Sequence, residues 1–161
     1  MTDALMLRQL RHDLWATEQL IERCRALSAA QLELTVPGTY GTIRRTLEHI
    51  VGADESYLSR LGLPVAEPFG PDANATLERI AAHFAAVKTG AERILSHDFD
   101  AERLMPTRRG PTPAWVMVTQ FVHHGSDHRA HIGTILGAHG LDAPEFDVWA
   151  YARAVGALPD A

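Results

Sequence analysis

The sequence predicts an all-α fold, an up-down four-helix bundle with long loops and a short C-terminal helical extension. Four stretches of helical length carry apolar residues at spacings of three and four, the pattern of a helix that buries one face. Clusters of Pro and Gly separate these stretches, and no convincing run of alternating polar and apolar residues indicates a sheet. Because 161 residues is about the length of one domain, we expect a single domain over residues 1–161.

The first two helices are expected over residues 3–27 and 42–61. Apolar side chains recur along one face of each stretch. Thr42 is the expected N-cap of the second helix, and Gly62 and Pro64 end it.

The third and fourth helices are expected over residues 77–96 and 113–138. A connector rich in Pro and Gly, residues 63–71, precedes the third helix, and some of the loops between the helices are long enough to cross the bundle. Gly140 ends the fourth helix, and a short extended piece is expected at 103–107.

Composition and charge argue against several classes of protein. A net charge of −5 with scattered Lys and Arg predicts no binding to nucleic acid. No apolar run approaches the roughly 20 residues of a membrane span, and the N-terminus lacks the pattern of a signal peptide, so we expect a cytoplasmic protein with no membrane association. The single cysteine, Cys24, excludes an internal disulfide and fits a buried structural thiol on the first helix.

Four of the nine histidines lie within HHGSDHRAHIG, residues 123–133. At about 100° per residue, His124 and His128 face the bundle core, whereas His123 faces solvent. The i, i+4 spacing places two imidazoles on one helix face, where both can bind one metal ion. His131 lies about 60° from His128 and can face the same cavity. The alternative is a structural bundle in which the histidines form hydrogen bonds with each other.

A third ligand is available from the second helix. His49, in LEHIVGADESYL, lies on a face of small and partly polar residues, with Glu48 and Glu55 expected further towards solvent. Small neighbours leave room for a pocket and an open coordination position. A surface histidine at the helix edge is the alternative. Asp54 and Glu55 are acid–base candidates only because they follow His49 closely.

The stretches TIRRTLEHIVGADESYLSRL and FVHHGSDHRAHIGTILGAHG resemble the two signature helices of the DinB/YfiT-like superfamily. These small metal-binding proteins include thiol-dependent S-transferases, and the resemblance covers nearly the whole chain. It implies that His49, His124 and His128 are the three metal ligands. Arg129 and Gly140 match the arginine and the terminal glycine of the family pattern.

Two positions depart from that pattern. Ala130-His131 replaces the usual Gly-Gln after the arginine, and Asp127 stands where relatives often have a histidine. The three ligands are retained, but the polar groups around the site differ from those of the relatives. Arg45, Arg108 and Arg109 could hold an anionic thiol or substrate, but isolated arginines are more often solvated, so they are not counted as site residues.

The resemblance implies a divalent metal ion, Zn, Ni or Fe, with an open position beside three neutral imidazoles. Such a site activates a thiol or a water towards a small-molecule substrate, as in an S-transferase or a hydrolase. The implied thiol is a low-molecular-weight one such as bacillithiol or mycothiol. A non-catalytic metal-binding or stress-response module is the alternative. Because free imidazoles titrate near pH 6.5, metal affinity is expected to fall below about pH 6.

The tail PEFDVWAYARAVG predicts a short fifth helix with Trp149 as its anchor. Large apolar side chains beside the main stripe gather on the first helix and in the tail: Leu5, Met6, Trp15, Phe146, Trp149 and Tyr151. This is more apolar surface than a four-helix core needs, so we expect a homodimer. The alternative is a monomer whose tail folds back over the first helix.

Overall fold

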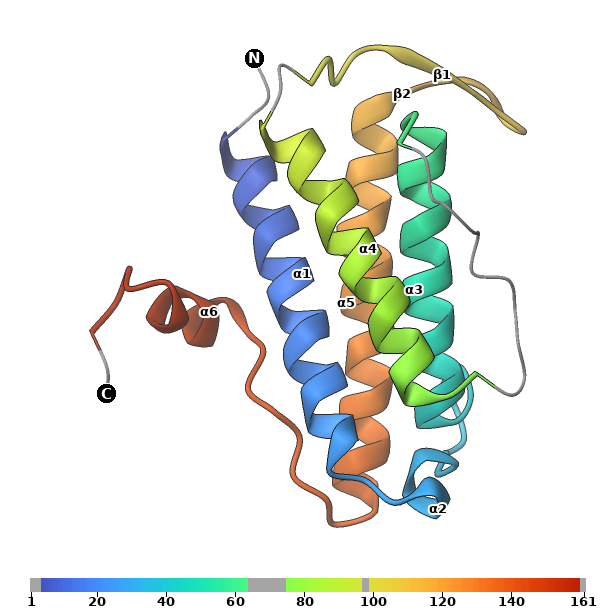
Figure 1. Ribbon diagram of the computed structural model, residues 1–161, viewed down its shortest axis with the longest axis vertical. Coiled ribbons are helices and arrows are strands. Elements are labelled where there is room, and N and C mark those ends of the chain that lie inside the picture. The colour runs from blue at the N-terminus through green and yellow to red at the C-terminus, as the bar shows by residue number, and fades with distance from the viewer. Residues whose placement is uncertain (1–3, 64–74, 97–98, 160–161) are drawn as a thin grey trace.

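The computed structural model describes residues 4–63, 75–96 and 99–159. Its long helices are α1 (Ala4–Arg25), α3 (Ile43–Arg60), α4 (Leu77–Ser96) and α5 (Ala114–Ala138). They form one bundle in which α1 and α3 each pack against both α4 and α5 (Figure 1). The predicted all-α fold is confirmed. Most of the expected connector, from residue 64 onward, lies outside the described residues.

The helix directions differ from strict up-down alternation. In Figure 1, α3 and α4 run in the same direction, while α1 and α5 run in the opposite one. Residues 61–76 separate α3 from α4, which is the length of a crossover connection rather than of a tight turn. The expected crossover-length loop is therefore found, and the expected alternation is wrong between these two helices.

Four short elements join and extend the long helices. α2 (Ala29–Leu32) is capped by Ser28, and α6 (Val148–Ala154) is the expected C-terminal helix. Strands β1 (Leu104–Thr107) and β2 (Gly110–Pro113) form an antiparallel hairpin over the end of the bundle (Figure 1). The expected extended piece corresponds to β1. The sequence did not predict β2, because a Gly and two Pro in four residues disfavour a strand.

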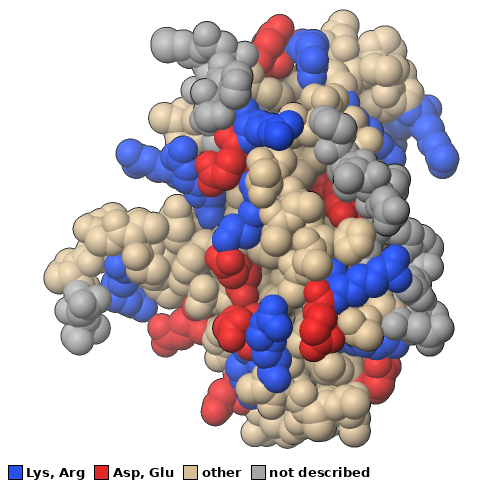
Figure 2. Space-filling model, viewed as in Figure 1, with Lys and Arg blue, Asp and Glu red and all other residues tan. Residues whose placement is uncertain are grey.

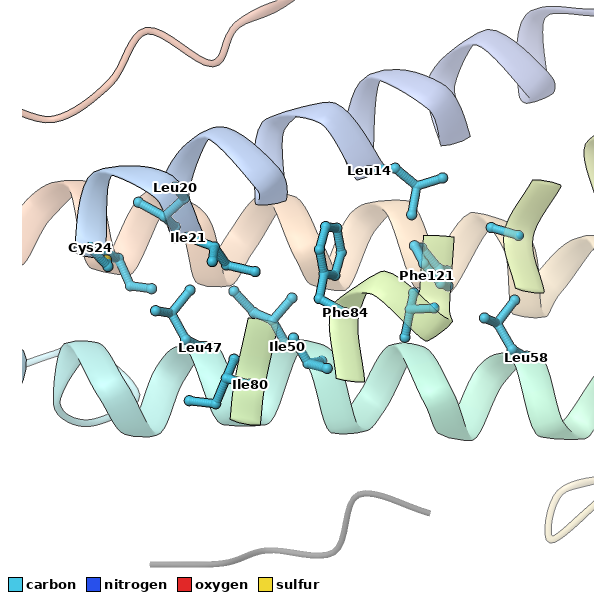
Figure 3. Close-up of a cluster of buried hydrophobic side chains, with 14 of the residues drawn as sticks. Leu14, Leu20, Ile21, Cys24, Leu47, Ile50, Leu58, Ile80, Phe84 and Phe121 are labelled. Carbon is cyan, nitrogen blue, oxygen red and sulfur yellow. The ribbon is translucent and has the colours of Figure 1, made fainter. Parts of the chain in front are cut away.

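The core lies between the four long helices. Leu20 of α1, Ile50 of α3, Phe84 of α4 and Phe121 of α5 point into the space between the helices at different positions along the bundle in Figure 3, and all are buried. Cys24 is buried in the same cluster, and burial raises the pKa of its thiol to about 12. A protonated, enclosed thiol is not a nucleophile, as the sequence indicated.

The surface of the bundle carries both signs of charge. Basic and acidic side chains alternate over the face shown in Figure 2. Within the described residues, no helix combines the length and the apolar composition that a membrane span requires.

A buried ion pair joins α5 to α1 inside the core. The Arg129 guanidinium lies 2.6 Å from Oδ1 of Asp13 and donates a second hydrogen bond of 2.8 Å to the Thr17 hydroxyl. All three residues are at most 3% exposed. Gly125 leaves the space for this pair, because a Cβ there would lie 2.7 Å from both Arg129 Nη1 and Asp13 Oδ1. The ion pair therefore depends on glycine at this helical position.

The C-terminal extension packs against α1. The Tyr151 ring lies 5.5 Å from both the Trp15 and the His12 rings, and His12 forms a 2.9 Å hydrogen bond with the Phe146 carbonyl. Trp149 is 67% exposed, so its expected role as the anchor is wrong, because the first turn of α6 turns it away from the bundle. The homodimer stays a prediction.

Replacing Gly125 with Ala should lower the free energy of unfolding by about 1–3 kcal/mol, because the new methyl group overlaps the buried ion pair. The matched control is Gly137→Ala on the same helix, where a Cβ meets nothing within 4 Å. That control should leave stability unchanged or raise it by up to ~1 kcal/mol, since Ala is the better helix former. Urea denaturation measures both, and equal effects would contradict the packing described.

Candidate metal centre

Three histidines from two helices meet on one side of the bundle. His49 lies on α3, and His124 and His128 lie one turn apart on α5. The facing Nε2 atoms of His49 and His124 are 2.9 Å apart, and each residue offers a nitrogen within 4.8 Å of the others. In the part of the chain that the structure describes, this is the one group of three or more His, Cys, Asp or Glu side chains placed to hold a metal ion.

The packing of α3 against α5 brings the three rings together. Their centroids are 4.4–4.7 Å apart, so each imidazole touches the other two. His124 and His128 lie in the middle turns of α5. His49 lies in the second turn of α3, which runs opposite to α5 (Figure 1).

The electrostatics of the cluster suit a metal ion. Burial, reinforced by the other imidazoles, lowers the pKa of both His124 and His128 to about 4. Burial, with Arg45 nearby, also lowers the pKa of His49. The imidazoles are therefore neutral at physiological pH, which is the form that binds metals. With pKa values near 4, protons compete with a metal at lower pH than the value near 6 expected from free histidine.

The distances also fit a shared ion. Two nitrogens bound at 2.0–2.1 Å to one tetrahedral ion lie about 3.3 Å apart. The observed distance between the Nε2 atoms of His49 and His124 is 2.9 Å, which is only a few tenths of an ångström shorter. The Nδ1 atoms of His124 and His128 are buried without a hydrogen-bond partner, so the cluster is not satisfied by protein groups.

Two tyrosines, Tyr40 and Tyr57, flank the cluster, and neither was predicted to lie beside it. The Tyr40 ring stacks on His49 at 4.0 Å, nearly parallel, and meets His128 edge-on at 4.9 Å. The Tyr57 ring lies 6.0 Å from His124. Tyr40 belongs to the loop before α3, so only the folded chain reveals that it covers a histidine two turns further along.

The remaining histidines of the HHGSDHRAHIG stretch take different positions. His123 is exposed and lies 3.4 Å from Asp127, which confirms that it faces solvent. The His131 ring lies 5.3 Å from that of His128, and its Nδ1 is buried without a partner. His131 is nevertheless not part of the group of three.

The acidic residues near His49 in sequence point elsewhere. Glu48 and Glu55 are 2% and 3% exposed, so the expectation that they face solvent is wrong. Arg45 pairs with Glu48 at 3.0 Å, and His83 of α4 pairs with Glu55 at 2.7 Å. These partners offset the desolvation cost of burying the two carboxylates.

Asp54 is fully buried in the bundle rather than in the histidine cluster. Burial and the nearby Asp13 carboxylate raise its pKa well above the usual range, which favours the protonated form. Asp54 therefore belongs with the buried Asp13–Arg129 pair. The structure places neither acid–base candidate, Asp54 or Glu55, in the cluster of three histidines.

Comparison with known proteins places the chain in a family. A family model, described as the DinB family, matches residues 1–157. The chain belongs to the DinB family. Its fold is similar to that of a DinB-like protein from Bacillus cereus ATCC 10987, with 22% sequence identity, a TM-score of 0.67, and coverage of 81% of this chain and 89% of that one. No curated protein is significantly similar to the chain.

In the metal-free protein, His124 and His128 should make the free energy of unfolding fall as the pH is lowered from about 6.5 towards 4. Their pKa is about 4 in the folded state and near 6.5 in the unfolded chain, so the unfolded state binds more protons throughout this window. Denaturant titrations at several pH values measure the effect. The variant His124→Gln/His128→Gln should lose less stability over this pH range. An equal loss would contradict the lowered pKa values of the two histidines.

Proposed function

We propose that this DinB-family protein is a metal-dependent enzyme in which His49, His124 and His128 hold a divalent ion. The observation that supports it best is the convergence of three imidazole nitrogens, from two helices, to within 4.8 Å of one another. Three protein ligands are fewer than the four positions of a tetrahedral ion, which leaves one for a reactant, as in catalytic metal sites.

The donor set restricts the metal and the reaction. Imidazole nitrogens suit Zn, Ni and Fe, and neutral ligands leave the ion its full charge of +2. An ion held in this way lowers the pKa of a thiol or a water towards neutrality and so makes it a nucleophile for group transfer or hydrolysis. The protein is thereby proposed to be of the S-transferase or hydrolase type, with a low-molecular-weight thiol or water as the nucleophile.

The protein's own residues orient the ligands and limit access by water. The Tyr40 ring covers one face of His49 and fixes the plane of that imidazole. The Tyr57 ring lies beside His124. His131 lies beside His128 and provides a further polar group next to the cluster.

A non-catalytic metal-binding module is the second candidate function. It is favoured by the absence of an acid–base carboxylate among the described residues of the cluster, since Glu48, Asp54 and Glu55 lie elsewhere. The two functions are separated by turnover. A thiol and an electrophile should react faster with metal-loaded protein than with metal-loaded His124→Ala, and identical rates would favour the module.

Tag-free protein should contain about one divalent ion per chain, and His124→Ala should lose most of it, since two imidazoles bind far less tightly than three. Elemental mass spectrometry after dialysis measures the content. His123→Ala is the matched control, because this neighbouring histidine is exposed and outside the cluster. A content below about a third of an ion per chain, unchanged in His124→Ala, would rule out the proposed centre.

A further inference from the structure

A large cavity opens between the hairpin and the ends of α3 and α5 that meet it. Its volume is about 940 Å³, at the upper end of the range for small-molecule sites. Residues of the β1–β2 turn form one wall, and Tyr57, Met117 and Gln120 contribute to the others. The cavity thus combines an apolar floor with polar side chains, as ligand sites do.

The cavity adjoins the histidine cluster. Tyr57 lines it and also contacts the ring of His124. Gln120, another lining residue, precedes His124 by four residues on α5, or about 6 Å along the helix axis. The cavity is therefore close enough for a molecule of moderate length to lie in it and extend past Tyr57 towards the cluster.

The charge of the cavity is positive. Arg60 from α3 and Arg108 and Arg109 from the hairpin turn line it, and none of its described lining residues is Asp or Glu. None of the three guanidinium groups forms an ion pair with a carboxylate of the described residues. Figure 2 shows basic side chains, without acidic ones beside them, at the outer end of the hairpin. Such a grouping is unusual in a chain whose net charge is −5.

The hairpin turn is built to present its two arginines. Thr107 pairs with Gly110 across the turn, so Arg108 and Arg109 occupy its two central positions. The Thr107 hydroxyl accepts a hydrogen bond from the Arg109 amide and lies 2.8 Å from the Gly110 carbonyl. Gly110 has φ of +96°, which the turn requires and which other residues rarely adopt.

We propose that this cavity is the substrate-binding subsite of the metal centre, and that Arg60, Arg108 and Arg109 hold a carboxylate or phosphate group of the substrate or thiol. Guanidinium groups bind such oxyanions through paired, charge-assisted hydrogen bonds. The other end of the ligand would then lie at the histidines. The substrate class is thus an anionic small molecule, an inference that builds on the proposed function of the histidine cluster.

Binding of glutathione, a thiol with two carboxylates, tests the subsite in the metal-free protein. The variant Arg108→Ala/Arg109→Ala should bind it at least about tenfold more weakly than the wild type, the effect of losing charge-assisted hydrogen bonds. The matched control is Arg8→Ala/Arg11→Ala, which removes the same charge from exposed positions on α1 and should bind as the wild type does. Glutathione diethyl ester, which lacks both carboxylates, should bind weakly to all three proteins.

Equal affinity in the two double variants, or an ester that binds as well as the acid, would overturn the subsite. Metal content measured on the same samples distinguishes this failure from failure of the metal centre. Arg108→Ala/Arg109→Ala should keep its full metal content, because neither arginine is part of the cluster. Arginine-dependent glutathione binding in a chain that holds no metal would support the subsite and count against the proposed enzyme.

Discussion

The buried ion pair between Arg129 and Asp13 fixes how α5 is rotated in the bundle. A charge enclosed in the core is tolerated only with its partner, so α5 cannot turn about its axis without leaving both groups unpaired. Arg129 directly follows His128 in the sequence and lies on a neighbouring face of the helix. Holding the arginine against α1 therefore directs His124 and His128 towards α3, where His49 meets them.

The same arrangement concentrates polar groups on one side of the α3–α5 interface. The histidines are kept neutral by burial and by one another, and the cavity beyond Tyr57 and Gln120 adds a positive wall. Neutral ligands next to a cationic cavity would favour anions at a bound metal ion, since neither group repels them. Both parts of the proposed site would thus favour an anionic ligand, although they derive from different elements.

The sequence predicted the long helices and the three clustered histidines. It did not predict the direction of α4 or the surroundings of the cluster, for physical reasons. Apolar spacing located the long helices, and i, i+4 spacing with the family resemblance located His49, His124 and His128. The direction of α4 depends on how a long connector crosses the bundle, which local pattern does not encode. Glu48 was expected in solvent but is buried. Its burial depends on pairing with the neighbouring arginines, Arg44 and Arg45, which the apolar pattern of the helix does not reveal. The convergence of Arg60 with Arg108 and Arg109 likewise exists only once the hairpin folds over the bundle.

The coordination shell of the bound ion tests the three-histidine centre most directly. X-ray absorption at the edge of the metal, recorded on the loaded full chain, reports both the identity and the distance of the ligands. We predict three imidazole nitrogens at about 2.0–2.1 Å, reduced to two in His49→Ala. A shell dominated by carboxylate oxygens, or one that His49→Ala leaves unchanged, would contradict the proposed centre.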